Sequence, residues 1–172
     1  MTQQTGTQQA GTQQAGTQQA GSPQTGDAAR YAGDLAPREA WELLASDPGA
    51  TLVDVRSRPE WSFVGVADLS SVGKRPLLLA WQTWTPGPQG AAMVANAGFA
   101  DELAAARPDR DAPVIFLCRS GVRSRAAAVA MTALGFTRAY NLAGGFEGAH
   151  DAARHRGQVE GWKVAGLPWT QD

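Results

Sequence analysis

Along the chain, short apolar runs alternate with segments whose apolar residues recur at helical spacing. Residues 51–56 and 113–117 have the length of strands, and the second run is unbroken, as in a strand that is covered on both faces. Pro37 suits a first helical turn, and the residues after it place Trp41 and Leu44 on one helical face. Further strands are predicted at residues 76–81 and 138–143, and further helices at residues 99–106 and 124–134. Strands that alternate with helices predict an α/β fold with a mostly parallel central sheet and helices on both faces.

The N-terminal segment follows a different pattern, a five-residue repeat of the form TQQTG or TQQAG. No charged residue precedes Asp27, and no Leu, Ile, Val or aromatic residue precedes Tyr31. A period of five fits neither a helix nor a strand, and the repeat lacks the apolar surface to offset an ordering cost of about 1–2 kcal/mol per residue. We therefore expect residues 1–29 to be a disordered low-complexity tail, with a docking arm as the alternative, and residues 30–172 to form a single folded domain.

Composition narrows the classes of function. The 15 Lys and Arg residues against 16 Asp and Glu residues give a net charge of −1, which offers no electrostatic reason to expect a nucleic-acid partner. No run approaches the roughly 18–20 apolar residues of a membrane span, and the N-terminus lacks the pattern of a secretory signal. We expect a cytoplasmic protein without a membrane partner. Its single cysteine, Cys118, excludes an internal disulfide and a multi-cysteine metal site, and we expect neither a metal nor another cofactor.

Cys118 follows the apolar strand at residues 113–117 and precedes a predicted helix. In parallel sheets this is the end at which ligands bind, because loops there lead into helix N-termini. Unpaired backbone N–H groups, the helix dipole and the guanidinium groups of Arg119 and Arg123 all favour a thiolate over a thiol. Gly121 supplies the conformational freedom that a loop wrapped around an anion needs. The alternative, an inert buried cysteine, fits poorly beside two permanent cations.

Four segments carry a resemblance to a known family. Residues 118–124 read CRSGVRS, between an apolar strand and a helix, and resemble the active-site loop of the rhodanese (sulfurtransferase) family. Residues 52–57 (LVDVRS) resemble the first strand of that family, residues 141–146 (NLAGGF) its last-strand signature and residues 162–168 (WKVAGLP) its C-terminal segment. The resemblance covers about residues 33–172 and implies a single-domain rhodanese-like fold with a central sheet of about five strands.

The resemblance implies a two-step sulfur transfer. The Cys118 thiolate takes the outer sulfur of a small anionic donor such as thiosulfate and holds it as a persulfide, which cyanide, a thiol or a protein cysteine then collects. Asp54 and Arg56 are expected to support the base of the loop. The donor and the persulfide are expected to contact the loop residues Arg119, Ser120, Gly121, Val122, Arg123 and Ser124.

Two other functions remain as alternatives. Related phosphatases and arsenate reductases place five residues between their cysteine and arginine, whereas four residues separate Cys118 from Arg123, so the loop favours a single sulfur over a phosphoryl group. A non-enzymatic domain that binds a partner or senses redox state through the same cleft is the second alternative.

Three segments depart from or elaborate the family pattern. Residues 64–68 lack the histidine that the family commonly has after its first strand. Residues 149–160 form an apparent insertion with two histidines, either beside the mouth of the site or on a solvated surface. Residues 81–96 follow a strand, and we expect Trp81 or Trp84 either to shape an acceptor pocket or to pack in the core.

Overall fold

The fold is taken from a computed structural model, which describes residues 1–2, 31–88 and 90–171. The predicted tail at residues 1–29 lies almost wholly outside the described residues. Four α-helices and one short 3-10 helix are described: α1 (Pro37–Ser46), α2 (Arg58–Val64), η1 (Ser70–Val72), α3 (Phe99–Ala106) and α4 (Val122–Ala133). The strands are β1 (Gly33–Leu35), β2 (Thr51–Asp54), β3 (Val66–Ala67), β4 (Leu77–Leu78), β5 (Gln82–Thr85), β6 (Ala92–Ala95), β7 (Val114–Leu117), β8 (Ala139–Leu142) and β9 (Trp169–Thr170).

Five strands form a parallel central sheet in the order β1-β8-β7-β2-β4. The register pairs Asp54 at the end of β2 with Leu117 at the end of β7, so both strands end at the same edge. Asp34 in β1 lies opposite Asn141 in β8. The predicted parallel α/β sheet of about five strands is confirmed.

Alternating side chains of the inner strands build a separate core on each face of the sheet. Val53 and Phe116 point into a cluster with α3 and α4, whereas Leu52 and Ile115 point into a cluster with α1 and the C-terminal segment. The predicted helices on both faces are therefore present.

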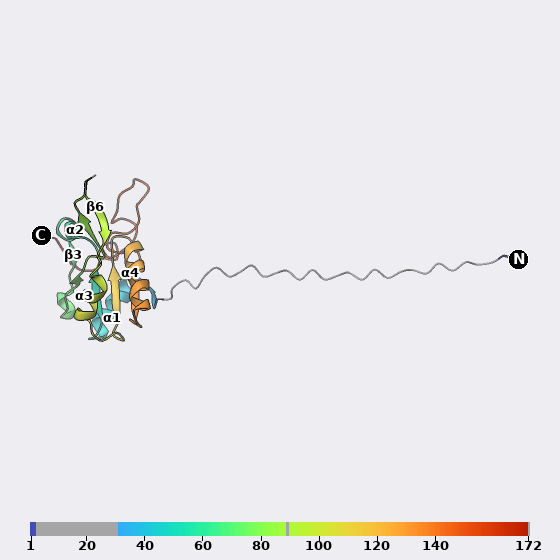
Figure 1. Ribbon diagram of the computed structural model, residues 1–172, viewed down its shortest axis with the longest axis horizontal. Helices are drawn as coiled ribbons and strands as arrows, with labels where there is room; N and C mark the ends of the chain where they lie inside the picture. The colour runs from blue at the N-terminus through green and yellow to red at the C-terminus, as the bar shows by residue number, and fades with distance from the viewer. Residues whose placement is uncertain (3–30, 89, 172) are drawn as a thin grey trace.

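Element boundaries agree with the pattern best where the apolar run is long. The helix at residues 99–106 has the expected ends, and the strand at residues 113–117 differs by one residue. The strand predicted at residues 76–81 is shorter, since only Leu77–Leu78 pairs with β2, and the chain then turns into an antiparallel β5–β6 hairpin. Figure 1 shows this hairpin at one end of the domain, away from α3.

The C-terminal segment belongs to the folded unit. β9 pairs with β3, and the fully buried Trp162 lies in the same core cluster as α1. The Trp162 ring donates from Nε1 to the Pro168 carbonyl at 2.8 Å. This segment closes one face of the sheet.

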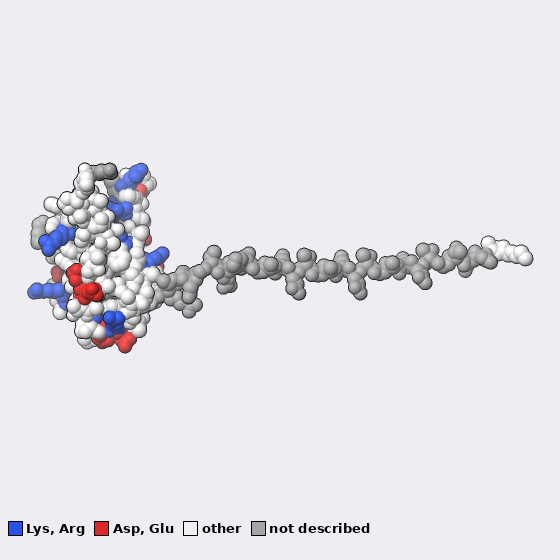
Figure 2. All heavy atoms as spheres, in the orientation of Figure 1, with Lys and Arg blue, Asp and Glu red and all other residues white. Residues whose placement is uncertain are grey.

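Charges of both signs are interspersed on the face shown in Figure 2. Among the described residues, no helix is long and apolar enough to cross a membrane.

Candidate active site

Cys118 lies where β7 ends and the loop into α4 begins. Its side chain is almost completely buried, and it packs in the cluster with α3 and α4. Gly121 precedes the first residue of α4 with φ +97°, a left-handed conformation that glycine adopts without a steric penalty. The loop therefore turns tightly around the sulfur.

Two groups contact the sulfur at hydrogen-bonding distance. The Gly121 amide donates to Cys118 Sγ at 3.2 Å, and the Ser124 hydroxyl oxygen lies 3.2 Å from the same atom. Because α4 begins at Val122, its positive dipole end also faces this loop. The Gly121 amide, the Ser124 hydroxyl and the start of α4 therefore surround the sulfur, and its predicted anionic state stays a prediction.

A Gly-Gly turn after β8 leads into a segment that holds the loop through backbone hydrogen bonds. The Phe146 amide donates to the Cys118 carbonyl at 2.7 Å, and the Glu147 amide donates to the Arg119 carbonyl at 2.9 Å. A Cβ on Gly145, whose φ is +60°, would lie 2.7 Å from the Arg119 carbonyl carbon. The close approach of two backbones explains why the position after Gly144 is also a glycine.

The sulfur faces a cavity of about 660 Å³. Loop residues form one wall, and Trp84 and Met93 of the β5–β6 hairpin form another. Val122 is largely exposed at the rim. The remaining lining residues come from α2 and the segment before it, from β5 and from the loop: Ser57, Pro59, Glu60, Gln82, Cys118, Arg119, Ser120 and Arg123.

Arg123 lines this cavity, but its charge is compensated. Its two terminal nitrogens donate to the two carboxylate oxygens of Glu60 at 2.9 and 2.5 Å. Burial raises the pKa of Glu60, but hydrogen bonds from Arg123 and from the Ser57 amide and hydroxyl outweigh it, and together they lower that pKa to about 2. Glu60 is therefore a carboxylate near neutrality and fixes the Arg123 guanidinium beside the loop.

Arg119 differs from Arg123. It is exposed and lines the cavity, and within residues 31–88 and 90–171 it takes part in no salt bridge. Of the two cations that the sequence singled out, Arg119 is the one whose charge is available to an anionic ligand.

Asp54 and Arg56 form a buried pair behind the loop. Arg56 donates from Nη2 to Asp54 Oδ2 at 2.6 Å and to the Gly65 carbonyl at 2.7 Å, and its guanidinium lies 4.1 Å from the centre of the Phe146 ring. Neither residue lines the cavity beside Cys118. Their expected role as supporting residues stays a prediction.

The two tryptophans of the 81–96 segment lie in different places. Trp81 packs edge-on against Phe99, with ring centres 4.9 Å apart, at the margin of the core. Trp84 is 55% exposed and lines the Cys118 cavity together with an adjoining groove of about 480 Å³ that also includes Trp61 and Leu78. Trp84 is thus the one of these two tryptophans that lines the Cys118 cavity, and its expected role in an acceptor pocket stays a prediction.

The 149–160 insertion does not line the Cys118 cavity. Its two histidines, His150 and His155, are exposed. No group of three or more His, Cys, Asp and Glu residues in the described part of the chain could hold a metal ion.

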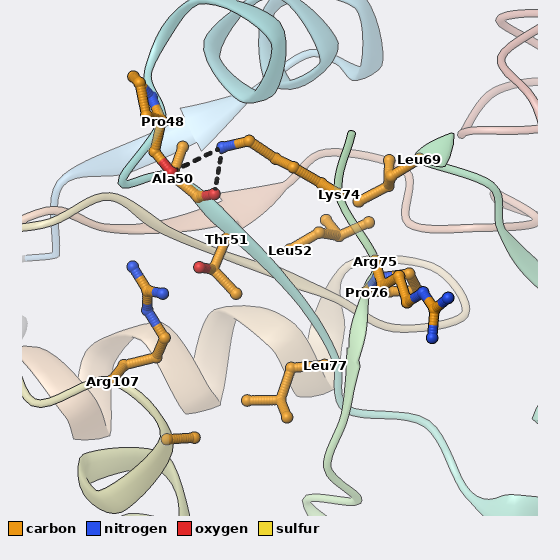
Figure 3. A pocket seen from close by; sticks show the side chains of 11 residues that line it. Pro48, Ala50, Thr51, Leu52, Leu69, Lys74, Arg75, Pro76, Leu77 and Arg107 are labelled. Carbon is orange, nitrogen blue, oxygen red and sulfur yellow. Dashed lines mark hydrogen bonds between the residues drawn. The ribbon is translucent and has the colours of Figure 1, made fainter. Parts of the chain in front are cut away.

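A different cavity, of about 340 Å³, is lined by Thr51 and Leu52 at the start of β2, and Figure 3 shows its lining side chains. Lys74 reaches across it and donates to the carbonyl oxygens of Asp47 and Ala50 at 2.6 and 2.7 Å. Burial lowers the pKa of Lys74. Its ammonium group is already hydrogen-bonded to these backbone carbonyl oxygens. This lysine ties the start of β2 to the segment before β4.

The sequence interpretation missed four polar residues at or near the site. Ser57 and Glu60 have the S-x-x-E spacing of a capping box at the start of α2, a signal that was available. Asn141 is fully buried and bonds to Ser124, and Asp34 bonds to Asn141. No local pattern marks Asp34, because only the pairing of β1 with β8 brings it there.

The fold and the loop identify the class of protein. The family model for the rhodanese-like domain matches residues 36–152, and the chain belongs to that family. A crystal structure of Rv0390 from M. tuberculosis is 50% identical, with a TM-score of 0.71, over 83% of this chain and all of that chain.

Two curated relatives cover most of the chain as well. The uncharacterized protein RP600 homolog of Rickettsia rickettsii is 36% identical over 79% of this chain and 95% of its own length. The thiosulfate sulfurtransferase GlpE of Actinobacillus pleuropneumoniae is 29% identical over 78% of this chain and 90% of its own length. A polysulfide-sulfur transferase homodimer of Wolinella succinogenes shares the fold at 22% identity and a TM-score of 0.54, over 81% of this chain and 78% of that chain.

Proposed function

We propose that this protein is a sulfurtransferase that carries sulfane sulfur on Cys118. The observation that supports this most is the position of one buried sulfur at the base of an open cavity, between a donating amide and a helix N-terminus. The similarity to a thiosulfate sulfurtransferase supports the same activity.

The reaction has two steps that share one intermediate. The Cys118 thiolate attacks the outer sulfur of a donor such as thiosulfate, a sulfur–sulfur bond forms as the donor's own sulfur–sulfur bond breaks, and sulfite leaves with the electron pair. A second nucleophile, namely cyanide, a thiol or a protein cysteine, then attacks the outer sulfur of the persulfide and releases Cys118 as a thiolate.

Four groups around the sulfur have a role in this proposal. Arg119 attracts the anionic donor, and the Gly121 amide stabilises negative charge on sulfur. Arg123 adds a positive field whose reach is limited by Glu60. Trp84 offers an apolar wall to the acceptor, and the cavity is much larger than thiosulfate alone requires.

Intact-protein mass spectrometry tests the proposal. After incubation with thiosulfate, we expect the mass to increase by one sulfur atom, and cyanide to remove the increase. Cys118→Ser should show no increase, and its melting temperature reports whether it still folds. If the wild-type protein gains no sulfur from thiosulfate, the partner-binding or redox-sensing alternative is favoured.

A further inference from the structure

A chain of hydrogen bonds leads from the sulfur to the surface. Ser124 Oγ lies 3.2 Å from Cys118 Sγ and 2.6 Å from Asn141 Oδ1. Asn141 Nδ2 donates to Asp34 Oδ1 at 2.7 Å. Cys118, Ser124 and Asn141 are almost completely buried, whereas the Asp34 side chain is 35% exposed. These hydrogen bonds therefore link a buried nucleophile to a carboxylate that is partly exposed to solvent.

The charge of Asp34 is held by its partners. Tyr31 donates its hydroxyl to Asp34 Oδ1, and Arg125 donates to Asp34 Oδ2, each at 2.6 Å. Burial raises the pKa of Asp34, but the bonds from Tyr31, Asn141 and Arg125 outweigh it and lower that pKa. Asp34 is therefore a carboxylate, which only accepts hydrogen bonds.

The number of protons on these side chains fixes the direction of each hydrogen bond between them. A carboxylate at position 34 requires the NH₂ group of Asn141 to face it, so the Asn141 carbonyl oxygen faces Ser124. The Ser124 hydroxyl has one proton, and at 2.6 Å from a carbonyl oxygen that proton belongs between the two oxygens. The Ser124 oxygen then presents a lone pair to Cys118. An S–H group can donate a hydrogen bond to this lone pair, whereas a thiolate has no proton to donate.

We propose that Asp34 and Asn141 are positioning residues that aim the Ser124 proton away from Cys118 in the resting protein. When the sulfur ionises, its own proton leaves to solvent, and the Ser124 proton stays on its oxygen but turns from Asn141 to the sulfur. The nucleophile thus forms only as the Ser124–Asn141 bond breaks. This step rests on the proposed function only in taking Cys118 as the nucleophile.

Other charged groups lie around the loop that holds the sulfur, and the test leaves them unchanged. They are Arg119 in the loop, Arg123 of α4 with its partner Glu60 of α2, and the Asp54–Arg56 pair behind the loop.

The substitution Asp34→Asn tests the direction of these hydrogen bonds. An amide at position 34 can donate to the Asn141 carbonyl oxygen, so Asn141 can turn its NH₂ group toward Ser124. The Ser124 hydroxyl then accepts from Asn141, and its own proton is free to form a hydrogen bond to the sulfur. We expect alkylation of the single cysteine by iodoacetamide, measured across about pH 5 to 10, to become roughly fivefold to tenfold faster below its midpoint, because a charge-assisted bond is gained. Asp34→Glu should restore the slow rate.

Two controls separate this effect from a simple loss of charge. In Ser124→Ala the link is absent, so adding Asp34→Asn should change the alkylation rate less than about twofold. Arg125→Gln removes the surface ion pair but keeps the carboxylate, so no acceleration is expected. The proposal would be overturned if Asp34→Asn gave no acceleration, or an equal one with and without the Ser124→Ala substitution. Alkylation needs no sulfur donor, so this result is independent of whether thiosulfate loads the protein.

Discussion

At the scale of single residues, the site depends on how its charges are paired. Arg119 and Arg123 look equivalent in the sequence, but Glu60 binds Arg123 through both carboxylate oxygens and leaves Arg119 exposed. The sequence identified the cysteine and its cations because they lie within seven consecutive residues. It did not identify Glu60 as the partner of Arg123, because the two are 63 positions apart and meet only through the fold.

The Glu60–Arg123 pair predicts a specific pH dependence of stability. The folded-state pKa of Glu60 is about 2, below its ordinary value of 4.5, so the pair stabilises the folded protein above about pH 4.5 and this stabilisation is lost as the pH falls toward 2. Solvent screens part of this interaction, so we expect Glu60→Gln to lower the free energy of unfolding by on the order of 2 kcal/mol at neutral pH, with the two proteins converging at the acid end.

Urea unfolding at several pH values measures this difference. The exposed Glu42→Gln serves as the control, and its stability should follow that of the wild type at every pH. A constant offset between Glu60→Gln and wild type over the whole pH range would contradict the assignment.

At the scale of elements, the sequence predicted long apolar runs well and short ones poorly. β7 and α3 were found because each has a continuous apolar face. β1 is only three residues long and begins with Gly33 at φ +127°, so no local pattern marks it. β5 and β6 are exposed on most of their positions, and they pair with each other in a hairpin that begins directly after the strand expected at residues 76–81.

The two tryptophans of residues 81–96 are expected to have different roles. Trp81→Ala should lower the free energy of unfolding by about 2–4 kcal/mol, because it removes an aromatic contact with Phe99 at the core margin. Trp84→Ala should change stability by less than about 0.5 kcal/mol but raise the KM for a thiol acceptor about threefold to tenfold. Melting curves and steady-state transfer rates separate the two. A Trp84→Ala variant that loses stability with an unchanged KM would place Trp84 in a packing role instead.

At the scale of the whole molecule, the folded unit extends beyond the part that matches the family model. That match ends at residue 152, but Trp162 is fully buried in one cluster with α1, and β9 pairs with β3. The sequence motifs already place residues 162–168 in the domain, through their resemblance to a C-terminal segment. What local patterns do not reveal is that this segment forms part of one core.

Trp162→Ala tests this extent. We expect a loss of about 3–5 kcal/mol in the free energy of unfolding, as for other fully buried tryptophans, measured by chemical denaturation. Trp169→Ala, at a 40% exposed position, is the matched control and should cost much less. A small effect at Trp162 would mean that the core is complete without the C-terminal segment.

The central claim is that Cys118 carries the outer sulfur of the donor from one molecule to the next. Thiosulfate labelled with a sulfur isotope at its outer position tests this directly, with mass spectrometry of the protein followed by analysis of the thiocyanate formed on adding cyanide. We predict that the label appears first on the wild-type protein and then in thiocyanate, and that it appears in neither with Cys118→Ser. Labelled thiocyanate formed equally well by Cys118→Ser, or a wild-type protein that never carries the label, would contradict the account.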